Sequence, residues 1–303
     1  MNWDQARKLF TLARLHDAPD ASGVAPRAAD ELSLVRARSL CIASGKGGTG
    51  KSVVCAALSE LFARQGHALV LDADMGVGNA HILHDLCPQH SLVDVVEGRL
   101  TVREVVLRAR TGLDLVAAGS GVSRMAGLTG YELHLVASGL EALEPEYDRV
   151  VVDSAAGISA QTISFAAASD AVLIVTTPDV TALTDAYAFL KVLLQRRPEC
   201  APSFVVNRAT SAEEGAAVAE RLRAVSRKFL GREPRCLGTI PEDRAVASSV
   251  AARQPVSVFA PESQAARALE RLARTLQQEL EGSAPRGLGR QLLRTIASTP
   301  KIA

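Results

Sequence analysis

Short apolar runs alternate with longer segments of helical periodicity over most of the chain. Seven of these runs are rich in β-branched residues and end at turn residues, as strands do. They are residues 39–44, 68–74, 113–119, 149–154, 171–177, 203–208 and 236–240. The run 149–154 contains three successive valines, which is typical of a central strand buried on both faces. The alternation predicts an α/β fold with a mostly parallel, doubly wound sheet that is flanked by helices.

The two ends of the chain differ from this pattern. Residues 2–15 have helical spacing, and a stretch rich in Ala, Pro, Ser and Gly follows them. A long helix is expected over residues 261–280. We therefore expect four regions, which are an N-terminal helix at 1–17, a flexible linker at 18–37, one large domain at 38–282 and a C-terminal segment at 283–303.

The C-terminal segment 283–303 contains basic residues and no acidic one. At about 100° per residue, four apolar side chains of this segment fall within an arc of ~140° on a helix. They are Leu288, Leu292, Leu293 and Ile296. Such a basic amphipathic helix predicts a weak contact with an anionic membrane surface, which two copies would strengthen. The alternative is that the segment packs against its own domain.

Composition narrows the class of protein. The chain is 48% hydrophobic, and its net charge of +1 lacks the strong positive field of a dedicated nucleic-acid binder, so a nucleic-acid partner is not expected. The five cysteines form no C-x-x-C pair, which favours a reduced cytosolic setting over a disulfide framework or a zinc site. We find no signal-peptide pattern and no run of about 18 apolar residues, so any membrane contact is expected to be peripheral.

A glycine-rich segment directly after the first expected strand satisfies the pattern G-x-x-x-x-G-K-[ST] and precedes a helix. It consists of Gly45, Lys46, Gly47, Gly48, Thr49, Gly50, Lys51 and Ser52. Glycines let backbone N–H groups fold around a phosphate, and the following helix adds the positive end of its dipole. Lys51 is expected to reach the β- and γ-phosphates, and the Ser52 hydroxyl to bind Mg²⁺. The segment therefore predicts a site for ATP or ADP with Mg²⁺.

Three aspartates end strands at the same expected edge of the sheet. Asp72 and Asp74 close the run 68–74, and Asp153 closes the run 149–154. Ligands bind at the carboxyl edge of open α/β sheets. We expect Asp72 and Asp153 to hold Mg²⁺, and Asp74 to orient the attacking water or accept its proton. The alternative for each is a structural cap of the following turn.

The loop KGGTGKS (46–52) resembles the deviant Walker A loop of the MinD/ParA family, whose first lysine acts across a dimer interface. DADMGVGNA (72–80) resembles the switch I segment of that family, and VVDSAAGIS (151–159) its Walker B and switch II region. The resemblance covers about residues 39–258. It implies an ATPase with catalytic residues Lys46, Lys51 and Asp74. It also implies that adenine lies near Asn207, Pro241 and Asp243.

Within this family the chain most resembles the flagellar-number regulators, the FlhG (FleN, YlxH) group. The similarity lies in residues 113–121, in residues 176–193 and in an N-terminal D-Q-A-x-x-L motif formed by Asp4, Gln5, Ala6 and Leu9. That motif implies contact with the SRP-type GTPase FlhF, although Phe10 stands where the group has arginine. The group further implies a slow ATPase with an ATP-dependent homodimer. A flagellar C-ring protein or flagellar transcription regulator and the inner face of the cell membrane are the other implied partners.

Three other functions use related folds. A ParA-type DNA or cargo partitioning ATPase needs a basic surface, for which residues 221–235 are the candidate, diluted by Glu220 and Glu233. The basic residues of this stretch are Arg221, Arg223, Arg227, Lys228, Arg232 and Arg235. An iron–sulfur scaffold of the Mrp type requires a C-x-x-C pair, and a bacterial exopolysaccharide tyrosine kinase a tyrosine-rich tail. The sequence contains neither.

Overall fold

A computed structural model describes residues 36–76, 78–110, 112–119 and 127–297 of the chain. The expected N-terminal helix with Asp4, Gln5, Ala6 and Leu9 lies outside the described residues, as does the linker up to residue 35. The described residues form one compact unit built around a single sheet.

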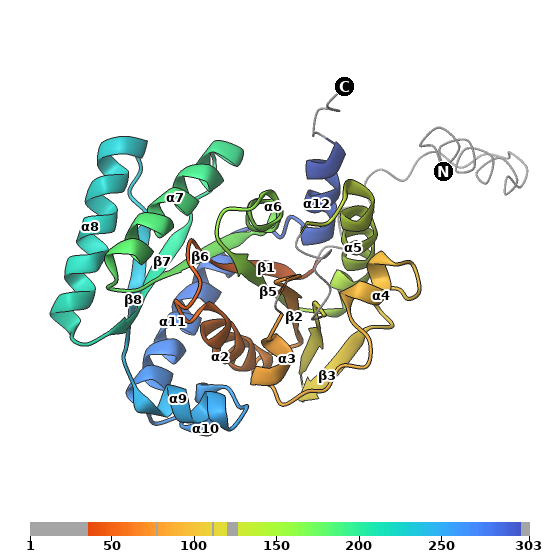
Figure 1. The fold of residues 1–303 in the computed structure, drawn as a ribbon, viewed down its shortest axis with the longest axis horizontal. Helices are drawn as coiled ribbons and strands as arrows, with labels where there is room; N and C mark the ends of the chain where they lie inside the picture. The colour runs from red at the N-terminus through yellow and green to blue at the C-terminus, as the bar shows by residue number, and fades with distance from the viewer. Residues whose placement is uncertain (1–35, 77, 111, 120–126, 298–303) are drawn as a thin grey trace, which may run out of the picture. The chain divides into compact units, whose positions relative to one another are not determined.

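The sheet has eight strands in the order β3-β4-β2-β5-β1-β6-β7-β8 (Figure 1). All neighbouring pairs are parallel except β3 and β4, which pair antiparallel. The strands are β1 (Arg38–Ser44), β2 (Ala68–Ala73), β3 (Val106–Arg110), β4 (Leu113–Val116), β5 (Arg149–Ala156), β6 (Ala171–Thr176), β7 (Ser203–Ala209) and β8 (Arg235–Pro241). The predicted fold class is confirmed, and each of the seven predicted runs contains a strand. The edge strand β3 was not predicted.

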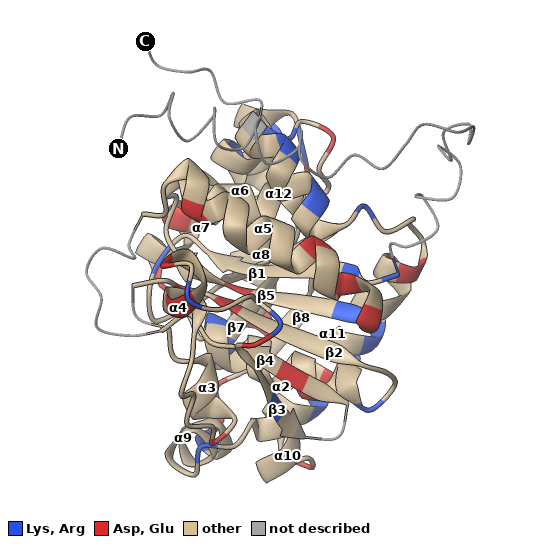
Figure 2. Cartoon of the chain, turned by 90° about the vertical axis from the view of Figure 1, so that its right-hand side faces the viewer, with Lys and Arg blue, Asp and Glu red and all other residues tan. Residues whose placement is uncertain are grey.

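Helices cover both faces of the sheet (Figure 2). One face carries α4 (Leu92–Val96), α5 (Gly130–Leu143), α6 (Ala160–Ala168), α7 (Val180–Arg196), α8 (Ala212–Leu230) and α12 (Leu288–Ala297). The other carries α2 (Lys51–Ala63), α10 (Val256–Phe259) and α11 (Gln264–Glu281). The short helices α3 (Ala80–Leu83) and α9 (Arg244–Ala251) and the 3-10 turn η3 (Glu144–Glu146) complete the described elements. No described helix is long and apolar enough to cross a bilayer.

Local signals in the sequence explain where several helices begin and end. Thr129 and Glu132 form a capping box at the start of α5, so two otherwise unpaired N–H groups are satisfied there. The Ser263 side chain accepts from the Ala266 N–H, which starts α11 at Gln264 rather than at the predicted residue 261. Gly231, with φ 62°, ends α8 in the left-handed region that favours glycine.

The C-terminal helix α12 packs against α5 and α6 in the same core as the rest of the unit (Figure 2). Leu288 and Leu292 are only 1% and 0% exposed, and Leu293 and Ile296 are half-buried. Two of the four predicted membrane-facing side chains are therefore buried in this conformation, and the other two are partly covered. The described part of segment 283–303 instead adopts the alternative that its amphipathic pattern equally allows, so contact with lipid requires α12 to leave this position.

Polar groups hold the start of α12 in place. The buried Glu144 carboxylate accepts a hydrogen bond of 2.8 Å from the Gly289 N–H, and it thereby caps the helix from another element. Just before the helix, the Arg286 N–H donates to Asp170 Oδ1 at 2.9 Å. Asp170 Oδ2 accepts from the N–H and the hydroxyl of Ser39, which ties the helix start to β1.

Candidate nucleotide and metal site

The glycine-rich loop lies between the end of β1 at Ser44 and the start of α2 at Lys51. Gly48 and Gly50 have φ angles of 80° and 86°, a region that L side chains rarely adopt. A Cβ added to Gly47 or Gly48 would meet no atom within 4 Å, so the face of the loop is open. An open backbone loop at the start of a helix has the geometry of an anion cradle.

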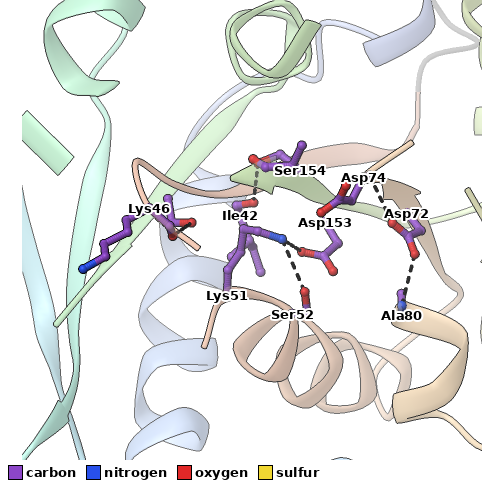
Figure 3. Close-up of polar contacts among 11 residues, drawn as sticks. Ile42, Lys46, Lys51, Ser52, Asp72, Asp74, Ala80, Asp153 and Ser154 are labelled. Atoms are coloured by element: carbon purple, nitrogen blue, oxygen red, sulfur yellow. Dashed lines mark hydrogen bonds and ion pairs between the residues drawn. The ribbon is translucent and has the colours of Figure 1, made fainter. Parts of the chain in front are cut away.

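Lys51, Asp153 and Asp72 form a buried charged cluster beneath this loop (Figure 3). Lys51 Nζ makes an ion pair and hydrogen bond with Asp153 Oδ1, and their side chains are 7% and 2% exposed. Asp72 lies opposite Asp153 in the register of β2 and β5. The structure thus brings Asp72 and Asp153 together at one edge of the sheet, as predicted, with Lys51 beside them.

The charges of this cluster are unbalanced, because one lysine faces two buried carboxylates. Burial and the nearby charge of Asp153 raise the pKa of Asp72 to about 7, although the N–H groups of Ala80 and Asp74 act in the opposite direction. Burial alone would lower the pKa of Lys51, but the charge and hydrogen bond of Asp153 raise it above its usual range. A cation placed beside Asp72 would relieve this imbalance, so the residues present fit a divalent metal.

Ser52 and Asp74 complete the predicted set. Ser52 Oγ lies 3.3 Å from Lys51 Nζ, on the same side as the cluster. Asp74 is half-buried just after β2, and its backbone N–H donates to Asp72 Oδ1 at 3.1 Å. In the described part of the chain, no group of three or more His, Cys, Asp or Glu side chains forms a ready-made metal site. A metal held here would therefore need ligands beyond the protein carboxylates, as Mg²⁺ in nucleotide sites takes phosphate oxygens and water.

Lys46 points away from the buried cluster, although it belongs to the same loop (Figure 3). Its Nζ lies 2.7 Å from Asp179 Oδ2 and also donates to Thr181 Oγ1. Both partners stand at the start of α7, and the Lys46 side chain is 39% exposed. In this conformation Lys46 is bound to its own subunit.

A cavity of about 560 Å³ opens beside the outer face of the loop. Its lining residues are Lys46, Gly47, Gly48, Thr49, Thr177, Pro178, Asp179, Ala182, Arg208, Thr210, Glu214 and Glu242. Arg208, in β7, donates from Nε to Oε2 of Glu242, the residue directly after β8, at 2.9 Å. Both residues lie within the two stretches, 204–208 and 241–244, near which the base was expected, although neither was itself named as a contact.

The three residues predicted to surround a base are not in that lining. Asn207 Nδ2 donates to the Thr49 carbonyl at 2.8 Å, so its side chain supports the loop from beneath. Pro241 is the last residue of β8. The Asp243 carboxylate accepts from the N–H groups of Ala245 and Ala265 at 2.9 and 3.1 Å, and it thus caps α9 and α11. Pro241 and Asp243 lie beside the cavity through the neighbouring Glu242, and their predicted contact with a base stays a prediction.

Comparison with known proteins agrees with this architecture. Residues 37–276 match the family described as cellulose biosynthesis protein BcsQ. The antiactivator FleN of Pseudomonas aeruginosa is 32% identical over 249 residues, which cover 82% of this chain and 89% of FleN. The flagellum site-determining protein YlxH of Helicobacter pylori is 31% identical over 247 residues, covering 81% of this chain and 83% of YlxH.

Among solved structures, the septum site-determining protein MinD of Pyrococcus horikoshii, complexed with Mg-ADP, has a similar fold. The TM-score is 0.67 at 23% identity, over 80% of this chain and 96% of that chain. At this level of identity the likeness concerns the fold.

Proposed function

Since this chain belongs to the BcsQ, MinD and ParA family of P-loop ATPases, we propose that it is an ATP-dependent dimerising switch that regulates the number or placement of bacterial flagella. The observation that carries the ATPase is the buried cluster of Lys51, Asp153 and Asp72 beneath an open glycine loop. The flagellar role is supported by the similarity to FleN and YlxH over more than four fifths of the chain.

The N–H groups of residues 45–52 bind the phosphates of ATP, and ATP is the substrate. Lys51 turns from Asp153 towards the β- and γ-phosphates, because it cannot bind both at full strength. Ser52, Asp72 and Asp153 are the residues that would hold Mg²⁺, which when bound neutralises charge on the phosphate oxygens. The cavity lined by Pro178, Arg208 and Glu242 accommodates the nucleoside.

Asp74 orients the attacking water or accepts its proton, since it is half-buried at the end of β2, beside the cluster. In Asp74→Ala we expect ATP binding to persist while turnover falls about a hundredfold or more. Single-turnover hydrolysis and equilibrium binding of labelled ATP separate these two effects. Asp85→Asn is the matched control, because Asp85 is an acidic residue of the same segment that pairs with Arg253 on the surface. An unchanged rate in Asp74→Ala removes Asp74 from the mechanism.

A second copy of the chain closes over the nucleotide. Two large apolar side chains stand exposed at the edge of the sheet that carries the loop, namely Ile158 at 49% and Val180 at 70%. An interface at this edge would cover both side chains. Light scattering with and without ATP tests this step, and a mass that ATP does not change would refute the switch.

The ATP-bound dimer associates with the inner face of the cell membrane through α12, and the ADP-bound monomer is cytoplasmic with α12 docked. Docking supports this cycle because it hides the apolar face of α12 in the monomer. Flagellar partners, either a C-ring protein or a transcription regulator, bind the dimer. The segment with Asp4, Gln5, Ala6 and Leu9 contacts the GTPase FlhF. Deletion of this segment is expected to abolish co-purification with FlhF and to leave ATP turnover unchanged.

A ParA-type role in partitioning DNA is less well supported. Arg227 pairs with Glu220 and Glu233, and Arg235 pairs with Glu279, so two of the basic side chains of α8 and β8 are already compensated. This alternative would be supported if the protein bound non-specific DNA with an affinity that falls steeply between about 50 and 200 mM salt.

A further inference from the structure

Lys46 is held by a small built site at the start of α7. Asp179 uses one carboxylate oxygen, Oδ1, to accept from the N–H and the hydroxyl of Thr181, which begins the helix. The other oxygen, Oδ2, receives Lys46 Nζ at 2.7 Å, and Thr181 Oγ1 is a second acceptor for the same amine. The helix cap thus orients the carboxylate independently of its contact with the lysine.

The rest of the loop is fixed independently of this contact. The Ser44 hydroxyl donates to the Lys46 carbonyl at 2.9 Å, and Asn207 holds the Thr49 carbonyl from beneath. A Cβ at Gly45 would lie 2.8 Å from Asp185 Cβ, so the loop and α7 already pack closely. The Lys46 side chain can therefore leave Asp179 by rotating about its own bonds, without rearrangement of the loop.

We propose that Asp179 and Thr181 are positioning residues that hold Lys46 within its own subunit until a second copy of the chain presents a bound triphosphate. This inference rests on the proposed function, in which Lys46 acts across the dimer. Lys46 then exchanges the carboxylate of Asp179 for phosphate oxygens of the other subunit. The contact makes dimerisation depend on a ligand charge strong enough to compete with Asp179.

The exposure of the pair sets the size of the effect. The side chains of Lys46 and Asp179 are 39% and 50% exposed, so solvent screens their attraction. Pairs of this kind change an equilibrium by a factor of about 1.4 to 5. Because two lysines must be released when a dimer forms, the two contacts are expected to raise the apparent dimer Kd about 2- to 25-fold. Such a factor delays dimerisation without preventing it.

Asp179→Asn isolates the charge, because asparagine still caps a helix start and so keeps α7 intact. In the nucleotide-free protein, acylation of the Lys46 amine, followed by mass spectrometry, is expected to be about 1.4- to 5-fold faster in Asp179→Asn than in the wild type. With a non-hydrolysable ATP analogue, sedimentation equilibrium is expected to give a dimer Kd about 2- to 25-fold lower. Thr181→Val shifts both readouts in the same direction by less. Glu262→Gln, which removes an exposed partner of Arg267 elsewhere, leaves both unchanged.

The two readouts distinguish failure of this inference from failure of the proposed function. Equal acylation of Lys46 in the wild type and Asp179→Asn would overturn the inference. So would a higher dimer Kd in the variant, because Asp179 would then bind the lysine of the other copy. If acylation rises but neither protein dimerises with the analogue, the contact stands and the dimerising switch is wrong. A further control is Lys46→Gln, in which Asp179→Asn is expected to have no effect on the binding of the analogue.

Discussion

Gly289 is the point at which the backbone of α12 meets the backbone of α5. A Cβ at this position would lie 2.5 Å from the Ala137 carbonyl oxygen and 2.8 Å from Glu141 Cα, which are backbone atoms that cannot rotate away. α5 cannot retreat either, because its Val136 and Leu140 are fully buried in the core. The substitution Gly289→Ala is therefore expected to push α12 off α5. It does so without changing any of the apolar residues of α12.

The size of this effect follows from overpacking. Inserting a methyl group into a filled site costs about 1–3 kcal/mol, and contact with backbone places the cost at the upper end. A penalty of this size raises the equilibrium constant for undocking about 5- to 150-fold. The docked helix buries Leu288 and Leu292, which together contribute about 3–6 kcal/mol. The penalty thus removes a large fraction of what holds α12.

The assay is co-sedimentation with vesicles that contain anionic lipid, carried out without nucleotide. Wild-type protein is expected to stay in solution, and Gly289→Ala to bind, since its apolar face and its arginines become available together. Hydrogen exchange of the α12 amides reports undocking directly. Gly282→Ala is the matched control, because its Cβ would make only ordinary contacts of 3.5 Å with Gln278 and Glu279.

Two results would refute the reasoning. If the α12 amides of Gly289→Ala exchange as slowly as those of the wild type, the steric argument is wrong. If they exchange faster but the variant binds no vesicles, α12 has no useful affinity for lipid, and the proposed membrane step fails.

Three further predictions concern buried polar groups. Burial raises the pKa of Glu144 from 4.5 to about 7, so its contribution to the stability of the fold is fully present below pH 4.5 and is lost as the pH rises to about 7, by about 3 kcal/mol in total. The free energy of urea unfolding should fall more over this range in the wild type than in Glu144→Gln; identical profiles would contradict this. Asn207→Ala leaves the Thr49 carbonyl unpaired and should cost about 1–3 kcal/mol in urea unfolding, with weaker ATP binding; an unchanged midpoint would argue against a supporting role. Lys51→Met leaves Asp153 buried without its cation and should destabilise the free protein by about 3–5 kcal/mol in urea unfolding; a variant as stable as the wild type would contradict this.

Much of the fold could be predicted because parallel strands buried on both faces carry a strong local signal. The run RVVVDS became β5 in the middle of the sheet, and all its valines are buried. The strand β3 (VLRAR) escaped prediction, since it alternates with arginines at the sheet edge and pairs antiparallel with β4. An exposed edge strand lacks the continuous apolar run on which the prediction relied.

The contacts of the site likewise fall into those that could be predicted from the sequence and those that could not. The meeting of Lys51, Asp72 and Asp153 follows from parallel strands whose carboxyl ends share one edge, so topology alone placed them together. The contact of Lys46 with Asp179 joins residues 133 positions apart, and it depends on the rotamer that an exposed lysine side chain adopts. No periodicity or motif contains that information. The cap that Asp243 provides to α9 and α11 likewise depends on where α11 comes to lie.

The docking of α12 was ambiguous for a more general reason. An apolar stripe on a helix is the same whether it faces lipid or a protein core, and basic residues opposite the stripe are compatible with both. Gly289 is a signal that could have separated them. It stands three and four positions before Leu292 and Leu293, on the apolar face, where a lipid-binding helix gains from a larger side chain. A glycine there indicates that another backbone approaches closely.

These contacts place the C-terminal helix at the end of a continuous packed path from the loop. β5 carries Asp153 of the charged cluster, and Gly157, with φ 91°, turns the chain directly after it. The Gly157 N–H donates to the Ser44 carbonyl at 2.9 Å, where the glycine-rich loop begins. α6 starts at Ala160 and packs against α12. A change in the bonding of Asp153 therefore acts on the same short segment that positions α6, and α6 is one of the two helices that hold α12. In the proposed cycle this gives nucleotide binding a physical route to the release of α12 that needs no contact between the nucleotide and the C-terminal segment.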